Sequence, residues 1–344
     1  MKKFLVALPL VALVSACGGS GSSSNAGAQL KVVGSSTVYP FTTAVAEEYQ
    51  RANPGTSVIV ESTGTGAGIK LFCSGVGEQF PDMVNASRPM KASEYADCAK
   101  SGAKQVIEVP IGIDGLTLIQ AKGQPALNLT TADNYKALAA NPFGKPNTAT
   151  TWKDVNPALP AIKIRVLGPP PTSGTRDSLA ELILAKGCES DPAMKALKKT
   201  DEDKQKDICT KVREDGVFVE AGENDNLLVQ KVAADPGALG VLGFSFLDEN
   251  ADRVSPVSLG GVAPTEATIS DLSYPGSRKL YLYIKGEHLA AKPAMRQFVT
   301  AYARAISKGG MLEKRGLVPF AAADLAAATA QATALAPLDP ATLK

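Results

Sequence analysis

The chain has 344 residues, enough for one large two-lobed domain or two ordinary domains, and 44% of them are apolar, which is typical of a globular protein with an ample core. Because 36 basic residues face 34 acidic ones, the formal charge of +2 excludes the strongly basic surface of a nucleic-acid-binding protein. The single histidine, His288, excludes a histidine-rich metal site, and its setting in Lys-Gly-Glu-His predicts a surface turn.

The N-terminus predicts an exported lipoprotein. Two lysines precede the apolar stretch 4–14, which is too short to span a bilayer and has the length of a signal-peptide core. Residues 14–17 read Val-Ser-Ala-Cys and resemble a bacterial lipobox, so we expect a signal peptide over 1–16 and a lipid on Cys17. Cleavage that leaves Cys17 as a free thiol is the alternative. Residues 17–28 are rich in Gly, Ser, Asn and Ala and predict a flexible tether, which would hold a periplasmic or cell-surface domain at a membrane.

Four cysteines remain, and an even number in an exported protein favours disulfides. Of the three possible pairings we favour Cys73–Cys98 with Cys188–Cys209, because each bond joins neighbours in sequence and closes a modest loop. A four-cysteine metal site is the alternative, but these cysteines lack the C-x-x-C spacing of zinc sites. We therefore expect no metal.

Strand and helix signals alternate along the chain. Strands are expected over 30–33, 57–60, 83–86, 106–109, 116–119 and 162–167, with helices after the loops 34–37, 63–68 and 168–177. The two strands at 106–109 and 116–119 are separated by Pro110 and by Asp114-Gly115, which are turn signals. Alternation of this kind predicts an α/β fold with mostly parallel sheets, and the length predicts two such lobes.

Three loops share one pattern, in which a strand end is followed by Ser, Thr or Gly and then by a helix start. They are Ser-Ser-Thr at 35–37, Gly-Thr-Gly at 64–66 and Ser-Gly-Thr at 173–175. A helix start presents unpaired N–H groups and a partial positive charge, and hydroxyls add further donors, so each loop favours an anion. Ordinary N-capping explains any one loop, but the three together predict an oxyanion pocket.

Charged residues beside these loops extend the candidate site. Arg88 follows a strand end and Arg176 follows the third loop, and a guanidinium matches an oxyanion through two parallel hydrogen bonds; a solvated surface arginine is the alternative for each. Asp177, Asp225 and Asn226 are candidates to orient these arginines or to accept a proton from the ligand, although Asp177 also suits an ordinary helix start. No P-loop or nucleophile-elbow motif is complete, so nothing indicates an enzyme.

The loops in their order resemble the phosphate-binding protein of bacterial phosphate ABC transporters, the PstS family. The segments that carry the resemblance are GSSTVYP at 34–40, NASRP at 85–89, SGT at 173–175, GENDN at 222–226, and YP followed by SR within 274–278. Any one tripeptide is common, whereas the ordered set, spread over roughly residues 30–310, is specific.

The resemblance implies a type II periplasmic-binding-protein fold, with two α/β lobes joined by crossover strands and a ligand cleft between them. Lobe 1 would comprise residues 29–112 and 245–344, and lobe 2 residues 113–244. It also implies a receptor, rather than an enzyme, that captures inorganic phosphate without a cofactor and delivers it to the permease subunits of an ABC transporter. We expect a monomer that touches the membrane only through its N-terminal lipid.

Carried over position by position, the resemblance places a defined set of residues around the phosphate. The expected ligands are Ser36, Thr37, the N–H group of Val38, Thr65, Ser173, Gly174 and Thr175, joined by Arg88 and Arg176. Some family members carry at position 88 an Asp that accepts the proton of the bound phosphate, and an Arg where Pro169 and Pro170 stand here. That Asp would reject sulfate, because two acceptors would face each other unpaired. A receptor for another oxyanion, or a surface sensing or adhesion protein, is therefore the alternative.

Overall fold

Ten strands and a larger number of helices make up residues 29–343, which are the residues that the computed structural model describes. The strands are β1 (Gln29–Gly34), β2 (Ser57–Ser62), β3 (Met83–Ala86), β4 (Val106–Ala121), β5 (Asn128–Leu129), β6 (Val166–Gly168), β7 (Phe218–Glu220), β8 (Leu239–Gly243), β9 (Val254–Leu259) and β10 (Ser277–Lys285). The predicted signal peptide, Cys17 and the tether lie outside the described residues.

The helices fall into two groups along the chain. Those of the first group are α1 (Tyr39–Ala52), α2 (Thr65–Phe72), α3 (Ala92–Lys100), α13 (Ala294–Ala305) and α14 (Ala322–Ala334). Those of the second group are α4 (Thr131–Leu138), α5 (Trp152–Val155), α6 (Gly174–Ser178), α7 (Ala185–Cys188), α8 (Pro192–Thr200), α9 (Glu202–Thr210), α10 (Asp225–Ala234), α11 (Phe244–Glu249) and α12 (Glu266–Ser270), with a π-helical turn (Leu179–Leu184) between α6 and α7. None of the helices within the described part of the chain has both the length and the apolar character of a membrane span.

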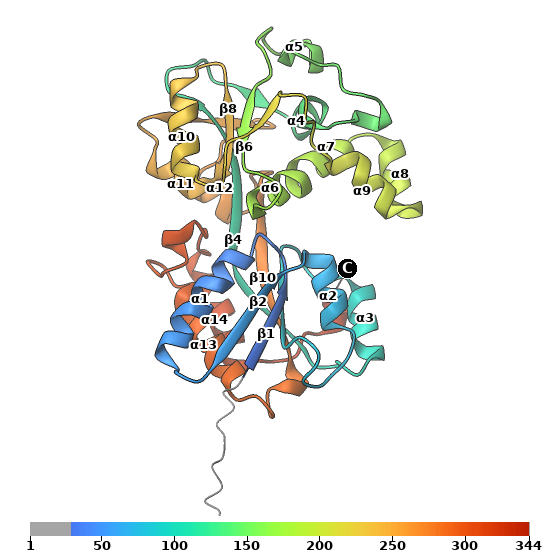
Figure 1. Cartoon of the computed structure of the whole chain (residues 1–344), viewed down its shortest axis with the longest axis vertical. Helices are drawn as coiled ribbons and strands as arrows, with labels where there is room; N and C mark the ends of the chain where they lie inside the picture. The colour runs from blue at the N-terminus through green and yellow to red at the C-terminus, as the bar shows by residue number, and fades with distance from the viewer. Residues whose placement is uncertain (1–28, 344) are drawn as a thin grey trace, which may run out of the picture.

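Two lobes share one continuous order of strands, β2-β1-β3-β10-β4-β8-β6-β7 (Figure 1). In lobe 1, β1 pairs in parallel with β2 and β3, and antiparallel β10 joins β3 to β4. In lobe 2, β6 pairs in parallel with β7 and β8, while β8 and β9 pair antiparallel with β4. Mixed sheets of this kind keep their parallel strands covered by helices on both faces.

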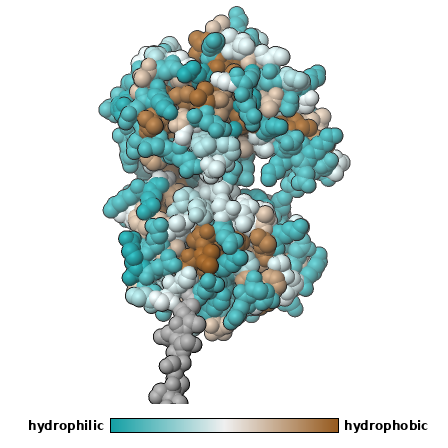
Figure 2. All heavy atoms as spheres, viewed as in Figure 1, coloured by the Kyte–Doolittle hydropathy of each residue, from teal (hydrophilic) through white to brown (hydrophobic). Residues whose placement is uncertain are grey.

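The sheet of lobe 1 separates two apolar cores. Leu30 and Val32 of β1 belong to the core that includes residues of α1 and α13, whereas Val33 belongs to the core that includes residues of α2 and α3, as the alternation of side chains along a strand requires. The larger core continues from the α1–α13 face through β4 into lobe 2. The space-filling view shows a waist between the lobes, with a notch on the side where α3 and α9 face each other (Figure 2).

The predicted pair of short strands at 106–109 and 116–119 is wrong, because β4 is one strand of 16 residues. Its first part pairs with β10 and its last part with β8 and β9, so it crosses from lobe 1 to lobe 2 without a turn. Asp114 and Gly115 stay extended because Arg278 and Ser277 of β10 lie opposite them. The register shifts beside Pro110, where β4 carries one extra residue, Ile111, between the partners of Tyr281 and Leu280.

The boundary expected at residue 245 is also wrong. β9 pairs with β4 and β5, and α11 and α12 lie with β8 in the upper lobe of Figure 1. The chain returns to lobe 1 only where β10 begins at Ser277, because β4 and β10 are the paired strands that link the lobes. Lobe 2 therefore takes in the residues between the two crossings, including α11, β9 and α12.

Both disulfides form as predicted, between Cys73 and Cys98 and between Cys188 and Cys209. The first joins the end of α2 to α3, and the second joins α7 to α9, so each holds a peripheral helix against its own lobe. Both lie in buried positions, with all four cysteines 6% exposed or less. A disulfide of this loop length typically stabilises a domain by about 3 kcal/mol.

His288 does not lie in a surface turn, as predicted, but is buried, with only 5% of its surface exposed. Its Nδ1 lies 2.7 Å from the carboxylate of Asp82, and its Nε2 accepts from the N–H of Gly77 at 2.9 Å. Because Nε2 acts as an acceptor, Nδ1 carries the proton and donates it to Asp82. The ring is thus neutral and holds the loop after Cys73 onto the end of the sheet.

Candidate functional site

All three predicted anion loops lie at the carboxyl ends of strands, on the edge of each lobe that faces the other. The first loop follows β1 and leads into α1, the second follows β2 and leads into α2, and the third follows β6 and leads into α6. In parallel α/β sheets this edge is where ligands bind, because strand ends and helix starts meet there.

The first and third loops touch across the two lobes. The Thr37 hydroxyl donates to the carbonyl oxygen of Gly174 at 3.2 Å, and the Ser36 hydroxyl donates to the carboxylate of Asp177. Contact is so close that a Cβ on Gly174 would lie 2.6 Å from Cα of Thr37 and 2.7 Å from the Ser36 carbonyl oxygen. The structure thus brings together residues that stand about 140 positions apart in the sequence.

Helix starts supply the N–H groups of this junction. No acceptor within residues 29–343 takes the N–H of Ser36, Thr37 or Gly174. The N–H of Val38 faces the Ser35 hydroxyl at 3.4 Å, and that of Thr175 donates to the Ser173 hydroxyl at 3.2 Å, which makes Ser173 the N-cap of α6. Unpaired N–H groups at helix starts are suited to an anion.

The second loop contributes a buried pair of hydroxyls. Thr65 Oγ1 and Ser87 Oγ lie 2.9 Å apart, and the N–H of Ser87 donates to Thr65 Oγ1 at 3.1 Å. Ser87 also donates to Glu181 of lobe 2 at 3.4 Å, so it faces the π-helical turn that follows directly on α6, the helix that the first loop contacts. Ser87 belongs to the NASRP segment but was not predicted as a site residue.

Arg88 lies beside this loop, but its guanidinium is already paired with the carboxylate of Glu94. Its guanidinium donates to both oxygens of Glu94, at 2.7 and 2.9 Å, and it lies 4.0 Å from where a Cβ on Gly66 would be. Burial would raise the pKa of Glu94, but the hydrogen bonds from Arg88 and from the N–H of Lys91, together with the positive charges of these two residues, lower that pKa overall. The positive charge of Arg88 is therefore largely neutralised at the start of α3.

Arg176, the second predicted arginine, packs inside lobe 2. Its guanidinium lies over the ring of Phe218, 4.2 Å from the centroid, and donates to the carbonyl of Pro169 at 3.1 Å. Burial lowers the pKa of Arg176. Arg176 therefore braces the proline-rich loop before α6 and is not brought together with Ser36 and Thr37.

The arginine at the junction is one that sequence reasoning missed. Arg278 of β10 donates to Thr37, Ser178, Glu181 and Asp114. The sequence does indicate that two of these partners lie near the third loop. Ser178 and Glu181 follow Gly174 by four and seven residues, a spacing that places all three on one face of a helix. Arg278 and Asp114 gave no such signal, since only the pairing of β10 with β4 makes them neighbours.

Asp225 and Asn226 lie at the start of α10, beside the third loop. Parallel pairing of Gly168 with Glu220 puts the ends of β6 and β7 at one edge, and the Thr172 hydroxyl donates to Glu223 at 2.6 Å. No hydrogen bond joins Asp225 or Asn226 to the junction within the described residues. Their predicted role in orienting the arginines therefore stays a prediction.

Replacing Asp225 with asparagine is expected to flatten the pH dependence of stability between pH 4 and 6. Burial raises the pKa of Asp225 to about 6, above the value of about 3.9 in an unfolded chain. An acid whose pKa is higher in the folded than in the unfolded protein stabilises the fold fully at a pH below its unfolded pKa. This stabilisation is lost as the pH rises through its folded pKa. Urea unfolding should therefore show Asp225→Asn more stable than the parent by about 1–3 kcal/mol at pH 7, and equal to it at pH 4.

Asp252→Asn, at an exposed position of the same lobe, is the control for Asp225→Asn and should leave the profile unchanged. A stability difference of the same size at pH 4 and pH 7 would contradict the assignment of the titration to Asp225.

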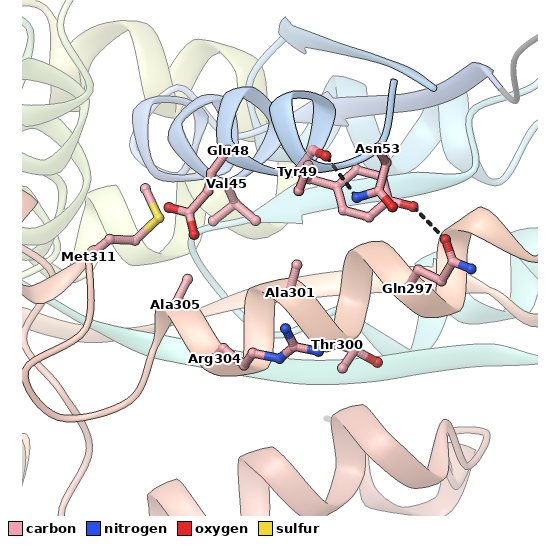
Figure 3. A pocket seen from close by; sticks show the side chains of 11 residues that line it. Val45, Glu48, Tyr49, Asn53, Gln297, Thr300, Ala301, Arg304, Ala305 and Met311 are labelled. Atoms are coloured by element: carbon pink, nitrogen blue, oxygen red, sulfur yellow. Dashed lines mark hydrogen bonds between the residues drawn. The ribbon is translucent and has the colours of Figure 1, made fainter. Parts of the chain in front are cut away.

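A separate hollow of about 410 Å³ lies between α1 and α13 (Figure 3). Tyr49, Gln297, Glu48 and Arg304 are among the residues that line it, and the Tyr49 hydroxyl donates to Gln297 at 3.0 Å. None of the residues predicted to bind phosphate lines this hollow. It is therefore distinct from the junction of the anion loops.

Known proteins resemble this chain along most of its length. The PBP superfamily domain matches residues 20–303. Protein SphX of Synechococcus elongatus is 32% identical over 336 residues, which cover 96% of this chain and 88% of the relative. The phosphate-binding protein PstS of Staphylococcus saprophyticus is 30% identical over 313 residues, which cover 89% of this chain and 85% of the relative.

Solved structures agree with these relatives. A possible phosphate-binding protein from Planctomyces limnophilus superposes with a TM-score of 0.71 at 28% identity, over 89% of this chain and 98% of that one. An ABC-type phosphate transport receptor from Vibrio cholerae superposes with a TM-score of 0.58 at 22% identity, over 85% of this chain and 100% of that one. The second likeness supports the fold alone.

Proposed function

Because this chain belongs to the PBP superfamily, and within it to the PstS family, we propose that it captures inorganic phosphate between its two lobes and delivers it to the permease of an ABC transporter. The observation that carries the proposal is the junction itself. Two helix starts, one from each lobe, meet at Thr37 and Gly174, where the N–H groups of Ser36, Thr37 and Gly174 have no acceptor within the described residues and hydroxyl groups lie beside them. Groups of this kind bind a tetrahedral oxyanion.

In the proposed site the lobes contribute separate donors to one phosphate. Those from lobe 1 are Ser36, Thr37, Val38 and Thr65, and those from lobe 2 are Ser173, Gly174 and Thr175. Each hydrogen bond to the charged ligand contributes about 1.5–3 kcal/mol. Both sets are satisfied only when the lobes are together, so the ligand favours the closed arrangement.

The charge that attracts the anion is proposed to come mainly from helix starts. Arg88 is occupied by Glu94, and Arg176 lies over Phe218. A helix start carries a partial positive charge and needs no counter-ion, so it binds an anion at little desolvation cost. This proposal departs from the sequence expectation, in which both arginines were ligands.

The chain is proposed to act as a receptor and not as an enzyme. Its one histidine is buried and bonded through both ring nitrogens, to Asp82 and to the N–H of Gly77. Within the described residues no group of His, Cys, Asp or Glu is arranged to hold a metal ion. The same proposal includes export, a lipid on Cys17 and action as a monomer beside the permease.

Calorimetric titration of residues 18–344, stripped of bound anion by partial unfolding, tests the proposed function. Phosphate at neutral pH should bind tightly, sulfate should give no heat, and a chromogenic phosphate ester should not be hydrolysed with or without added metal. Equal binding of both anions would replace the proposal with a general oxyanion receptor. Binding of neither anion would overturn it, in favour of a sensing or adhesion role for the fold.

A further inference from the structure

Arg278 stands on the crossover between the lobes, where it has one fixed partner. It lies opposite Asp114 in the pairing of β10 with β4, and its Nε donates to the Asp114 carboxylate at 3.1 Å. Its side chain is only 10% exposed. Because both residues belong to the two paired strands that link the lobes, this bond does not depend on how far the lobes are apart.

The other two nitrogens of Arg278 reach into both lobes. Nη2 donates to the Thr37 hydroxyl of lobe 1 at 3.0 Å and to the Ser178 hydroxyl of lobe 2 at 2.8 Å. Nη1 donates to the Glu181 carboxylate of lobe 2. Since a guanidinium is planar and rigid, it satisfies all of these acceptors only while the lobes are together.

The partners of Arg278 are themselves tied to the anion loops. Thr37 Oγ1, which accepts from Arg278, donates to the carbonyl of Gly174, and Ser178 lies one helical turn after Gly174 and is 2.7 Å from Asp114. Glu181 also accepts from Ser87, next to Thr65. One side chain is therefore linked to all three predicted loops, by one hydrogen bond to the first, two to the third and three to the second.

The positive charge of Arg278 is compensated by carboxylates of the protein itself. Two carboxylates, Asp114 and Glu181, surround its guanidinium, so it adds no net positive charge to attract an anion. A buried charge of this kind is costly to leave unpaired, which favours the arrangement that keeps all its partners. This distinguishes Arg278 from a residue that binds the ligand directly.

We propose that Arg278 is the positioning residue that couples closure of the lobes to the anion loops, without contacting the anion. The inference rests on the proposed function for the identity of the ligand, but not for the closure that it describes. Loss of the guanidinium fork should leave each lobe folded and each loop formed, while the closed arrangement becomes less stable relative to the open one.

The test compares two variants. Arg278→Lys keeps the positive charge but loses the planar guanidinium with its several N–H donors, and Glu181→Gln removes the charge of a half-exposed partner in lobe 2. Phosphate affinity is measured by calorimetry. Closure is measured by electron paramagnetic resonance between spin labels at the exposed positions Lys70 and Lys195, one on each lobe. Arg296→Lys, an exposed arginine on α13, is the matched control.

We expect Arg278→Lys to weaken phosphate binding about 30-fold and to leave a fraction of molecules open even at saturating phosphate. Glu181→Gln should weaken binding less, and the double variant should lose less than the product of the two single effects. Complete closure at saturation would assign Arg278 a direct ligand role instead. Unchanged affinity and closure in both variants, or effects that simply multiply, would overturn the proposal.

This design separates failure of the inference from failure of the proposed function. If the parent protein binds no phosphate, the proposed function fails. The spin-label distances without ligand then still decide the inference, because the parent should be more closed than Arg278→Lys. Equal distances in the two proteins would overturn it.

Discussion

Replacing Gly174 with alanine is expected to weaken phosphate binding about 100-fold or more while leaving the unfolding temperature almost unchanged. A Cβ at this position would lie 2.6 Å from Cα of Thr37 and 2.7 Å from the Ser36 carbonyl oxygen. Both atoms are backbone atoms of the other lobe and cannot rotate away, so the two loops would be held apart. A loss of about 2.7 kcal/mol in binding corresponds to 100-fold.

Calorimetry with phosphate measures this effect, and thermal unfolding without ligand serves as the check on folding. Gly237→Ala is the matched control in the same lobe, because a Cβ there would lie 3.6 Å from the Asp235 carboxylate, an ordinary contact. Wild-type affinity in Gly174→Ala would show that binding does not need the first and third loops to meet. A large fall in unfolding temperature would show instead that lobe 2 itself needs the glycine.

Replacing Asp82 with asparagine is expected to destabilise the protein by about 3–5 kcal/mol, the largest effect on stability that we predict. The Asp82 side chain has no exposed surface and accepts hydrogen bonds from His288, from Lys292 at 2.9 Å and from the N–H of Lys31 at 2.9 Å. Asparagine has one acceptor oxygen for these three donors, and it leaves the charge of Lys292 uncompensated.

The effect of Asp82 should also depend on pH. Burial by itself would raise the pKa of Asp82, but hydrogen bonds from His288, Lys292 and Lys31 outweigh it and hold the pKa below its ordinary value. An acid whose pKa is lower in the folded protein stabilises the fold fully at a pH above its unfolded pKa of about 3.9. This stabilisation is lost as the pH falls through its folded pKa. Urea unfolding should thus show a large difference between parent and Asp82→Asn at pH 7 and a small one near pH 2.

Asp97→Asn, at an exposed position of α3, is the control for Asp82→Asn and should change stability by less than about 0.5 kcal/mol. If Asp82→Asn and the parent protein have the same free energy of unfolding at pH 7, the buried carboxylate does not stabilise the end of the sheet. If the difference persists undiminished at low pH, loss of packing rather than of charge is the cause.

Local sequence signals located the parts of the site that depend on neighbours in the chain. Ser173 caps α6, and the loops before α1 and α2 end strands β1 and β2, as the patterns at 35–37, 64–66 and 173–175 predicted. The disulfides were predicted for the same reason, since each joins cysteines only 25 or 21 residues apart. The α/β two-lobe fold and membership of the PstS family, predicted from the order of these motifs, are confirmed.

The partners of charged side chains were not predicted from such signals. Arg88 was predicted to bind the anion, but Glu94, six residues later at the start of α3, accepts hydrogen bonds from Nη1 and Nη2 of Arg88. His288 was predicted at the surface, but it is buried in the folded protein, where its ring is hydrogen-bonded to Asp82, 206 positions earlier in the sequence. Which partner a charged side chain finds depends on the desolvation and geometry of the folded chain, and residue type alone does not specify either.

The sequence by itself determined where strands end and helices begin, and therefore that three helix starts with hydroxyls would lie at the edges of parallel sheets. This follows from local hydrogen-bonding and backbone preferences, which act within a few residues. Only the tertiary structure decided that β4 runs unbroken between the lobes and that Arg278 lies beside Thr37, 241 positions away. Such contacts depend on how the strands pair, and strand pairing is a property of the whole fold.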